Sequence, residues 1–237
     1  MKKDIIIVEN FYQDPLKVRE YALNELKNNR YLPYGIPTWY CSPLKEWNEC
    51  PFKSSNSLIN SLNEITSEEI DLDSWRKSFP SKEDYSIPEN KISNFPNRFK
   101  QPPPAWNCTF HIKPRTGQKL GQGVHNHVTD HSNCVDQNGW VGLIYLNPQA
   151  PTDTGLFLWE NKDKQKNYDW MTPKENWKLI DSLGSVFNRL ILCRGEKPHS
   201  GADGFSDILE EGRLYQTFFF KTKISTSKIY PAVSIDI

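Results

Sequence analysis

The stretch GWVGLIYLNPQAPTDTGLFLWE, residues 139–160, contains two apolar segments separated by a turn-forming segment. Residues 140–148 form an almost continuous apolar run, which is typical of a strand that is covered on both faces. Residues 154–160 have the same character and follow a connection rich in Pro, Thr and Asp. The stretch therefore predicts two buried strands joined by a short polar turn.

Further strands are predicted on both sides of this pair. Their segments alternate or cluster apolar residues and are bounded by turn signals; they are residues 107–114, 185–195 and 213–224. No helix of comparable strength interrupts this half of the chain, and the whole chain has 17 prolines and 12 glycines. Successive short strands of this kind predict a mainly β fold with flanking helices, most simply a double-stranded β-helix, or jelly roll, like that of the cupins.

The N-terminal part has the strongest helix signal in the sequence. Residues 14–29 begin with Asp14, a natural N-cap, followed by Pro15 at the first helical position. A stripe of apolar residues follows at helical spacing. A second helix is expected at residues 56–66.

The remaining N-terminal segments are a predicted buried strand, residues 5–11, and a polar, proline-punctuated stretch, residues 67–105. We expect the second of these to be irregular. The chain then divides into a helical and irregular supporting region, residues 1–106, and a β-helix core, residues 107–237, which together form one domain.

Charge and cysteine content exclude several classes of protein. Lys and Arg number 29, as do Asp and Glu, so nothing favours binding to nucleic acid or to an anionic membrane surface. The five cysteines are odd in number and lack a CxxC pair, which disfavours both a zinc site and a disulfide framework. We therefore expect reduced thiols, as in a cytoplasm, and a buried, inert thiol at Cys193.

No targeting or membrane-spanning segment is predicted. The apolar run IIIV, residues 5–8, is too short for a signal peptide. Nowhere does the chain approach the roughly 20 consecutive apolar residues needed to span a bilayer. The sequence thus predicts a soluble, cytoplasmic protein.

Histidine is concentrated in one polar stretch. GVHNHVTDHSNC, residues 123–134, contains three of the five histidines and lies between two predicted strands; His199 follows a later strand, and Arg213 begins the last one. Two imidazoles and a carboxylate on one face suit Fe(II) and leave coordination positions open. Arginine binds a carboxylate through two parallel hydrogen bonds. The pattern predicts a metal centre beside an anion site.

Several of these segments resemble the 2-oxoglutarate/Fe(II)-dependent oxygenases, in particular the prolyl-4-hydroxylase-like branch of bacteria and phages. They are residues 5–23, IIIVENFYQDPLKVREYAL; residues 139–160; residues 187–205, FNRLILCRGEKPHSGADGF; and residues 211–220, EGRLYQTFFF. The resemblance implies an enzyme that uses Fe(II), 2-oxoglutarate and O₂ to hydroxylate a protein side chain, an amino acid or another small molecule.

The resemblance also implies roles for individual residues. His199 corresponds to the distal metal ligand, Arg213 to the residue that binds the far carboxylate of 2-oxoglutarate, and Tyr145 to a hydrogen-bonding residue for the same cosubstrate. The proximal ligands depart from the usual H-x-D pattern, because the matching triplet is His125-Asn126-His127. The nearest acid, Asp130, lies one residue too far from His127.

Three ligand arrangements remain open. His127 and Asp130 could bind as H-x-x-D; His125 and His127 could bind with His199 as a three-histidine face; or His125 and Asp130 could bind across a bulge. Residues i and i+2 of a strand share a face, which favours the second arrangement. The charge of Fe(II) favours a carboxylate. His111, in the strand before this stretch, is given no role.

Two other functions also fit the sequence. The first is a jelly-roll binding module or metal-binding sensor without catalytic activity. The second is a cupin-type dioxygenase that uses three histidines and no 2-oxoglutarate, for which Arg213→Ala would leave turnover intact.

Overall fold

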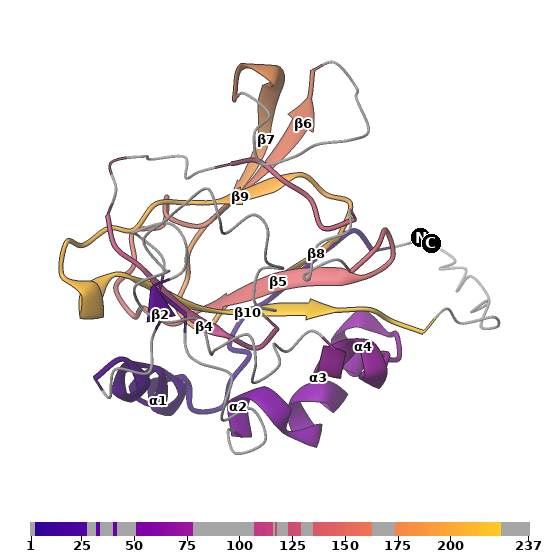
Figure 1. Ribbon diagram of the computed structural model, residues 1–237, viewed down its shortest axis with the longest axis horizontal. Coiled ribbons are helices and arrows are strands. Elements are labelled where there is room, and N and C mark those ends of the chain that lie inside the picture. The colour runs from indigo at the N-terminus through magenta and orange to yellow at the C-terminus, as the bar shows by residue number, and fades with distance from the viewer. Residues whose placement is uncertain are drawn as a thin grey trace, which may run out of the picture.

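The structure is a computed structural model, and it describes residues 3–27, 32–33, 40–41, 51–77, 107–115, 117, 123–128, 135–162 and 174–223. In this part of the chain, two antiparallel sheets face each other, and the helices lie on the far side of the larger sheet (Figure 1). The strand order is β1-β8-β5-β10-β4-β3-β2 in the larger sheet and β7-β6-β9 in the smaller one. The jelly roll predicted from the sequence is therefore confirmed.

The larger sheet consists of β1 (Ile5–Val8), β2 (Leu32–Pro33), β3 (Tyr40–Cys41), β4 (Phe110–Lys113), β5 (Trp140–Tyr145), β8 (Leu190–Arg194) and β10 (Arg213–Phe220). The smaller sheet consists of β6 (Leu156–Asn161), β7 (Trp177–Leu183) and β9 (His199–Gly201). The helices are α1 (Pro15–Lys27), α2 (Pro51–Ser54), α3 (Asn56–Thr66) and α4 (Leu72–Lys77), with single 3₁₀ turns at Lys174–Asn176 and Leu209–Glu211.

Strand β10 shows how the larger sheet separates two environments. Its side chains alternate, because successive residues of a strand point to opposite faces. Leu214 and Phe218 belong to the apolar core that packs against the helices. Tyr215 and Phe219 belong to a second core between the two sheets. Every side chain of this strand is buried, so both faces of the sheet are covered.

The helices begin and end at residues that satisfy their terminal backbone groups. Oδ1 of Asp14 accepts a hydrogen bond of 3.0 Å from the backbone N–H of Lys17, at the start of α1. Ser55 caps α3 in the same way, accepting from the N–H of Leu58 at 3.2 Å. Ser67 ends α3 in the left-handed region, at φ 58°. The expected N-cap at Asp14 and the expected bounds of α3 are both confirmed.

The apolar faces of these helices cover the outer side of the larger sheet. Val18 and Ala22 of α1, and Leu58 and Leu62 of α3, are at most 5% exposed and belong to its core. Burying a leucine side chain of this kind contributes about 2 kcal/mol, so tertiary packing, more than helix propensity, fixes these short helices. None of the described helices is long and apolar enough to cross a membrane.

The structure differs from the sequence expectations in three places. Strand β7 was not predicted, because its apolar and polar residues do not alternate regularly and five of its seven side chains are exposed; its extended shape comes from pairing with β6. Helix α4 lies within the stretch expected to be irregular; its Trp75 is buried and packs 5.8 Å from the ring of Phe220. Strand β1 is at the edge of the sheet and leaves Ile5 and Ile7 exposed, so it is not a buried strand.

An ion pair stabilises one end of the larger sheet. Arg194, the last residue of β8, is 2% exposed, donates to both carboxylate oxygens of Glu68, and lies 3.8 Å from the ring of Trp140. Burial alone would raise the pKa of Glu68, but hydrogen bonds from Arg194, Thr222 and Trp140 bring it below its ordinary value. The next residue, Gly195, accepts the backbone N–H of His127 at 2.7 Å, so this network adjoins the histidine stretch.

Candidate functional site

Backbone pairing brings His125 and His199 together. Each donates its N–H to the carbonyl of the other, at 3.0 and 2.9 Å, in an isolated antiparallel bridge. The bridge continues the smaller sheet beyond β9, and His127 follows two residues later on the same segment. Its backbone is also fixed, because its N–H donates to Gly195 and its carbonyl accepts from Val135 at 2.9 Å. The three histidines therefore lie on segments whose separation is set by main-chain hydrogen bonds.

Their imidazoles form one cluster. The ring centroids of His125, His127 and His199 lie 4.6 to 5.1 Å apart. One nitrogen of each ring can be chosen so that all three lie within 4.8 Å of one another. His127 and His199 are 5% and 7% exposed, and His125 is half-buried. Within the described ranges, these histidines form the one group of three or more histidine, cysteine or acidic side chains that is close enough together to bind a metal ion.

Hydrogen bonds orient two of these rings. Nδ1 of His199 lies 2.8 Å from the carbonyl of Lys197, and Nδ1 of His125 lies 3.1 Å from that of Gly123. A carbonyl accepts only, so each Nδ1 carries the hydrogen, and Nε2 is left as the ligating nitrogen. Burial lowers the pKa of His199, which the hydrogen bond to Lys197 partly opposes. The neutral imidazole required for metal binding is thus favoured.

Of the three proposed ligand sets, one can be traced in the structure. His125, His127 and His199 converge, as the three-histidine face requires. The other two sets include Asp130, which lies outside the described residues.

The imidazoles open into a small cavity between the two sheets. Its volume is about 60 Å³, and its walls are mostly apolar. The lining residues are His125, His127, Val141, Gly142, Leu143, Leu156, Cys193, His199, Gly201, Arg213, Tyr215, Thr217 and Phe219. Phe219 packs 4.9 Å from the ring of His127, whereas Arg213 lines the cavity from the opposite end of the same strand. The cavity therefore has the histidines at one end and a guanidinium at the other.

Arg213 is a buried cation without a carboxylate partner among the described residues. Its side chain is 1% exposed and donates to two carbonyls, Thr154 at 2.8 Å and Gly155 at 3.1 Å. Its guanidinium carbon lies 4.5 Å from the ring centroid of Tyr215 and 5.4 Å from that of Tyr145. Burying an unpaired charge costs several kcal/mol, so such a group is expected to bind an anion in the functional state.

Tyr145 lies beside this cation. Its hydroxyl is buried and makes no hydrogen bond of ordinary geometry with any described residue. Burial raises the pKa of Tyr145, and the nearby guanidinium of Arg213 opposes that rise. Tyr145 does not line the cavity itself, but an unsatisfied hydroxyl next to an unpaired guanidinium is a second sign of a missing polar ligand.

Tyr215, Thr217 and Gly201 are among the lining residues of the cavity that were not singled out from the sequence. Tyr215 and Thr217 line it because they lie two and four residues after Arg213 on one strand and so share its face. Gly201 lies where an added Cβ would come within 3.3 Å of the Arg213 guanidinium. The alternation could have identified the first two, whereas the role of the glycine depends on packing between two strands. Cys193 is buried as expected, and burial raises its pKa to about 12.

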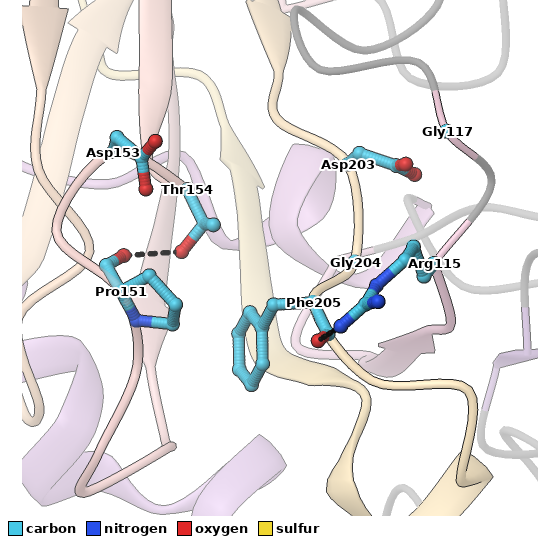
Figure 2. Close-up of a pocket in the computed structure, with 8 residues that line it drawn as sticks. All are labelled: Arg115, Gly117, Pro151, Asp153, Thr154, Asp203, Gly204 and Phe205. Atoms are coloured by element: carbon cyan, nitrogen blue, oxygen red, sulfur yellow. Dashed lines mark hydrogen bonds between the residues drawn. The ribbon is translucent and has the colours of Figure 1, made fainter.

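A larger hollow, of about 320 Å³, lies away from the histidines (Figure 2). It is lined by Arg115, Gly117, Pro151, Asp153, Thr154, Asp203, Gly204 and Phe205. Two of its charges already have partners of opposite charge: Asp203 lies 3.8 Å from the buried ammonium of Lys113, and Arg115 lies 4.0 Å from the carboxylate of Asp207. The smaller cavity, with its clustered imidazoles and unpaired cation, is therefore the stronger candidate site.

No family model matches the chain, and no curated protein does. Among solved structures, a prolyl hydroxylase from Trichoplax adhaerens, in complex with a hypoxia inducible factor peptide fragment, aligns with a TM-score of 0.51 at 14% identity, over 92% of this chain and 83% of that one. The chain has the fold of a prolyl hydroxylase. The resemblance seen in the sequence is thus confirmed for the fold.

Two further structures are more distant. HygX from Streptomyces hygroscopicus, with nickel and 2-oxoglutarate bound, aligns at 13% identity over 94% of this chain and 84% of that one, with a TM-score of 0.46. A prolyl-4-hydroxylase from Pseudomonas putida aligns at 12% identity over 93% of both chains, with a TM-score of 0.43. At these scores neither adds to the evidence for the fold.

Proposed function

We propose that this protein is a non-haem Fe(II)- and 2-oxoglutarate-dependent dioxygenase. The observation behind the proposal is the pairing, in one cavity, of an imidazole cluster suited to a divalent metal with a buried guanidinium that has no described carboxylate partner. A 2-oxo dicarboxylate matches both ends, because its oxo acid can chelate a metal while its second carboxylate pairs with the arginine.

The residues present fit such a metal. His125, His127 and His199 would bind Fe(II), which when bound supplies the activation of O₂ and the oxidation of 2-oxoglutarate that drive the reaction. Three imidazoles on one side suit a divalent ion of intermediate hardness and leave positions for other ligands. The thiol of Cys193 lines the same cavity, and burial raises its pKa to about 12, so it is protonated before a metal binds.

The remaining lining residues bind and shield the cosubstrate. Arg213 would bind the far carboxylate through charge-assisted hydrogen bonds, and the hydroxyl of Tyr145, whose ring centroid lies 5.4 Å from the guanidinium carbon, would join that contact. The walls formed by Leu143, Leu156 and Phe219 are apolar and exclude water, which strengthens the ion pair. These side chains bind and orient the cosubstrate, whereas the oxidation belongs to the metal.

The substrate we propose is a protein side chain, an amino acid or another small molecule, and hydroxylation is the expected outcome. The balanced charge of the chain gives no reason to propose nucleic acid.

The test is an anaerobic titration with Fe(II) and 2-oxoglutarate, followed by exposure to air. The proposal expects a visible absorption band of the metal chelate and production of succinate, both lost in His199→Ala. A chelate without succinate would indicate a metal-binding sensor, and neither signal would indicate a jelly-roll binding module. Turnover that persists in Arg213→Ala would indicate a three-histidine dioxygenase that needs no 2-oxoglutarate.

A further inference from the structure

His111 is a buried titratable residue that the proposed chemistry leaves unused. It lies in β4 opposite Tyr215 of β10, is 0% exposed, and stacks on the tyrosine ring with centroids 5.1 Å apart and planes at 10°. Tyr215 in turn pairs with Tyr145 of β5. The three rings form a row across neighbouring strands, and the guanidinium of Arg213 lies over both tyrosines. His111 is therefore part of the structure that supports the anion site.

Its hydrogen bond reaches the cavity. Nε2 of His111 lies 3.0 Å from Oγ1 of Thr217, and Thr217 lines the cavity between the histidine cluster and Arg213. The hydroxyl of Thr217 donates to the carbonyl of Thr109 at 3.4 Å, which is long for such a hydrogen bond, so a charged acceptor can compete for this hydrogen. If His111 donates to Oγ1, the hydroxyl hydrogen of Thr217 need not point at His111 and can be donated to an anion.

We propose that His111 is a positioning residue: as the Nε2–H tautomer it donates to Thr217 and so directs the threonine hydroxyl hydrogen toward the anion bound by Arg213. This inference rests on the proposed function, since it assumes that 2-oxoglutarate occupies the cavity. His111 itself does not touch the ligand.

The charge state of His111 fits this role. Burial, together with the positive charges of Arg213 and Lys53, lowers the pKa of His111 to about 3. The imidazole is therefore neutral at any pH near neutrality, with one N–H to donate. A neutral ring also avoids placing another positive charge beside Arg213.

The test is a double-mutant cycle on 2-oxoglutarate binding, measured by calorimetry with the Ni(II)-loaded protein. His111→Leu and Thr217→Val should each weaken binding about tenfold, and the double variant should be about tenfold weaker as well, because both changes remove the same contact. His111→Gln, which retains a neutral N–H donor, should stay within about threefold of the wild type. Ni(II) affinity should be the same in all four.

Wild-type-like binding by His111→Leu, or losses that multiply to about 100-fold in the double variant, would overturn the role of His111 while leaving the proposed function intact. Absence of 2-oxoglutarate binding in the wild type would instead remove the proposed function and this inference with it. Should His111→Leu fail to fold, His111→Phe keeps a ring on Tyr215 and replaces it in the cycle.

A second measurement is independent of binding. Nitrogen-15 NMR of the histidine rings distinguishes the two neutral tautomers. An Nε2–H ring at His111 supports the proposal, and an Nδ1–H ring overturns it whatever the calorimetry gives.

Discussion

Replacing Arg213 with methionine should remove 2-oxoglutarate binding but cost the ligand-free protein little stability. Most buried arginines are expected to behave differently, because removing one partner of a buried ion pair leaves the other charge uncompensated. Arg213 has no such partner among the described residues, so its removal leaves no described carboxylate without a counter-charge.

The size of the effect follows from the contacts. The carbonyl of Gly155 also accepts from the N–H of Ala202 at 2.9 Å, so only the carbonyl of Thr154 loses its donor, at a cost of about 1–3 kcal/mol. Relief of the desolvation of the guanidinium offsets this by several kcal/mol. Methionine has similar volume and length, so no large cavity results. We expect the free energy of unfolding to change by less than about 1 kcal/mol, or to increase.

Arg194→Met is the matched control. Arg194 is equally buried but donates to both carboxylate oxygens of Glu68, so its replacement should cost about 3–5 kcal/mol. Urea unfolding of both variants without ligand measures the contrast. The measurement is then repeated with Ni(II) and with 2-oxoglutarate at 100 times its dissociation constant. The ligand should stabilise the wild type by about 2.7 kcal/mol, whereas Arg213→Met should be stabilised no more than by Ni(II) alone. Equal destabilisation of the two ligand-free variants would refute the reasoning, because Arg213 would then be a structural residue.

Three further predictions concern the histidines and Asp130. His199→Ala should lower Ni(II) affinity at least about 100-fold by calorimetry, whereas Arg213→Met should leave it unchanged; equal affinities in both would place the metal elsewhere. Asp130→Asn should keep Ni(II) affinity within about threefold if the three imidazoles are the ligands, and a loss as large as that of His199→Ala would place the carboxylate in the ligand set. The pKa of His111 is about 3 in the folded protein and 6.5 ordinarily. At a pH between these two values the imidazole takes up a proton only when the protein unfolds, so the free energy of unfolding should fall as the pH drops below 6.5. This loss of stability is about 2 kcal/mol at pH 5 and should be absent in His111→Leu. Urea unfolding of both proteins at pH 5 and 7.5 measures it, and the same pH dependence in His111→Leu as in the wild type would contradict the prediction.

Much of the fold could be predicted from periodicity. The apolar runs that begin at Trp140 and Arg213 are strands β5 and β10, and the helix predicted at residues 56–66 is α3. These segments could be predicted because the order of apolar and polar residues along each of them reflects which side chains are buried. Strand β7 could not be predicted, because its apolar and polar residues do not alternate regularly and the strand is extended through pairing with β6. Trp75 likewise belongs to the core through contact with a distant strand.

The site was predictable in part. His199 and Arg213, singled out from the sequence, line one cavity together with His125 and His127, which were among the ligand choices; the roles of all four stay predictions. Gly201 was not identified, because its importance lies in the space it leaves for a guanidinium from another strand.

The sequence by itself determined several of the strands and helices, among them β5, β10 and α3, and which residue types are available for metal and anion binding. Those properties follow from nearest neighbours along the chain, through side-chain alternation and capping. Only the tertiary structure decided that His125 pairs with His199, that Arg213 is buried without a described carboxylate partner, and that His111 bonds to Thr217. Strand register and charge compensation depend on segments far apart in the sequence, and burial determines how strongly each such contact counts.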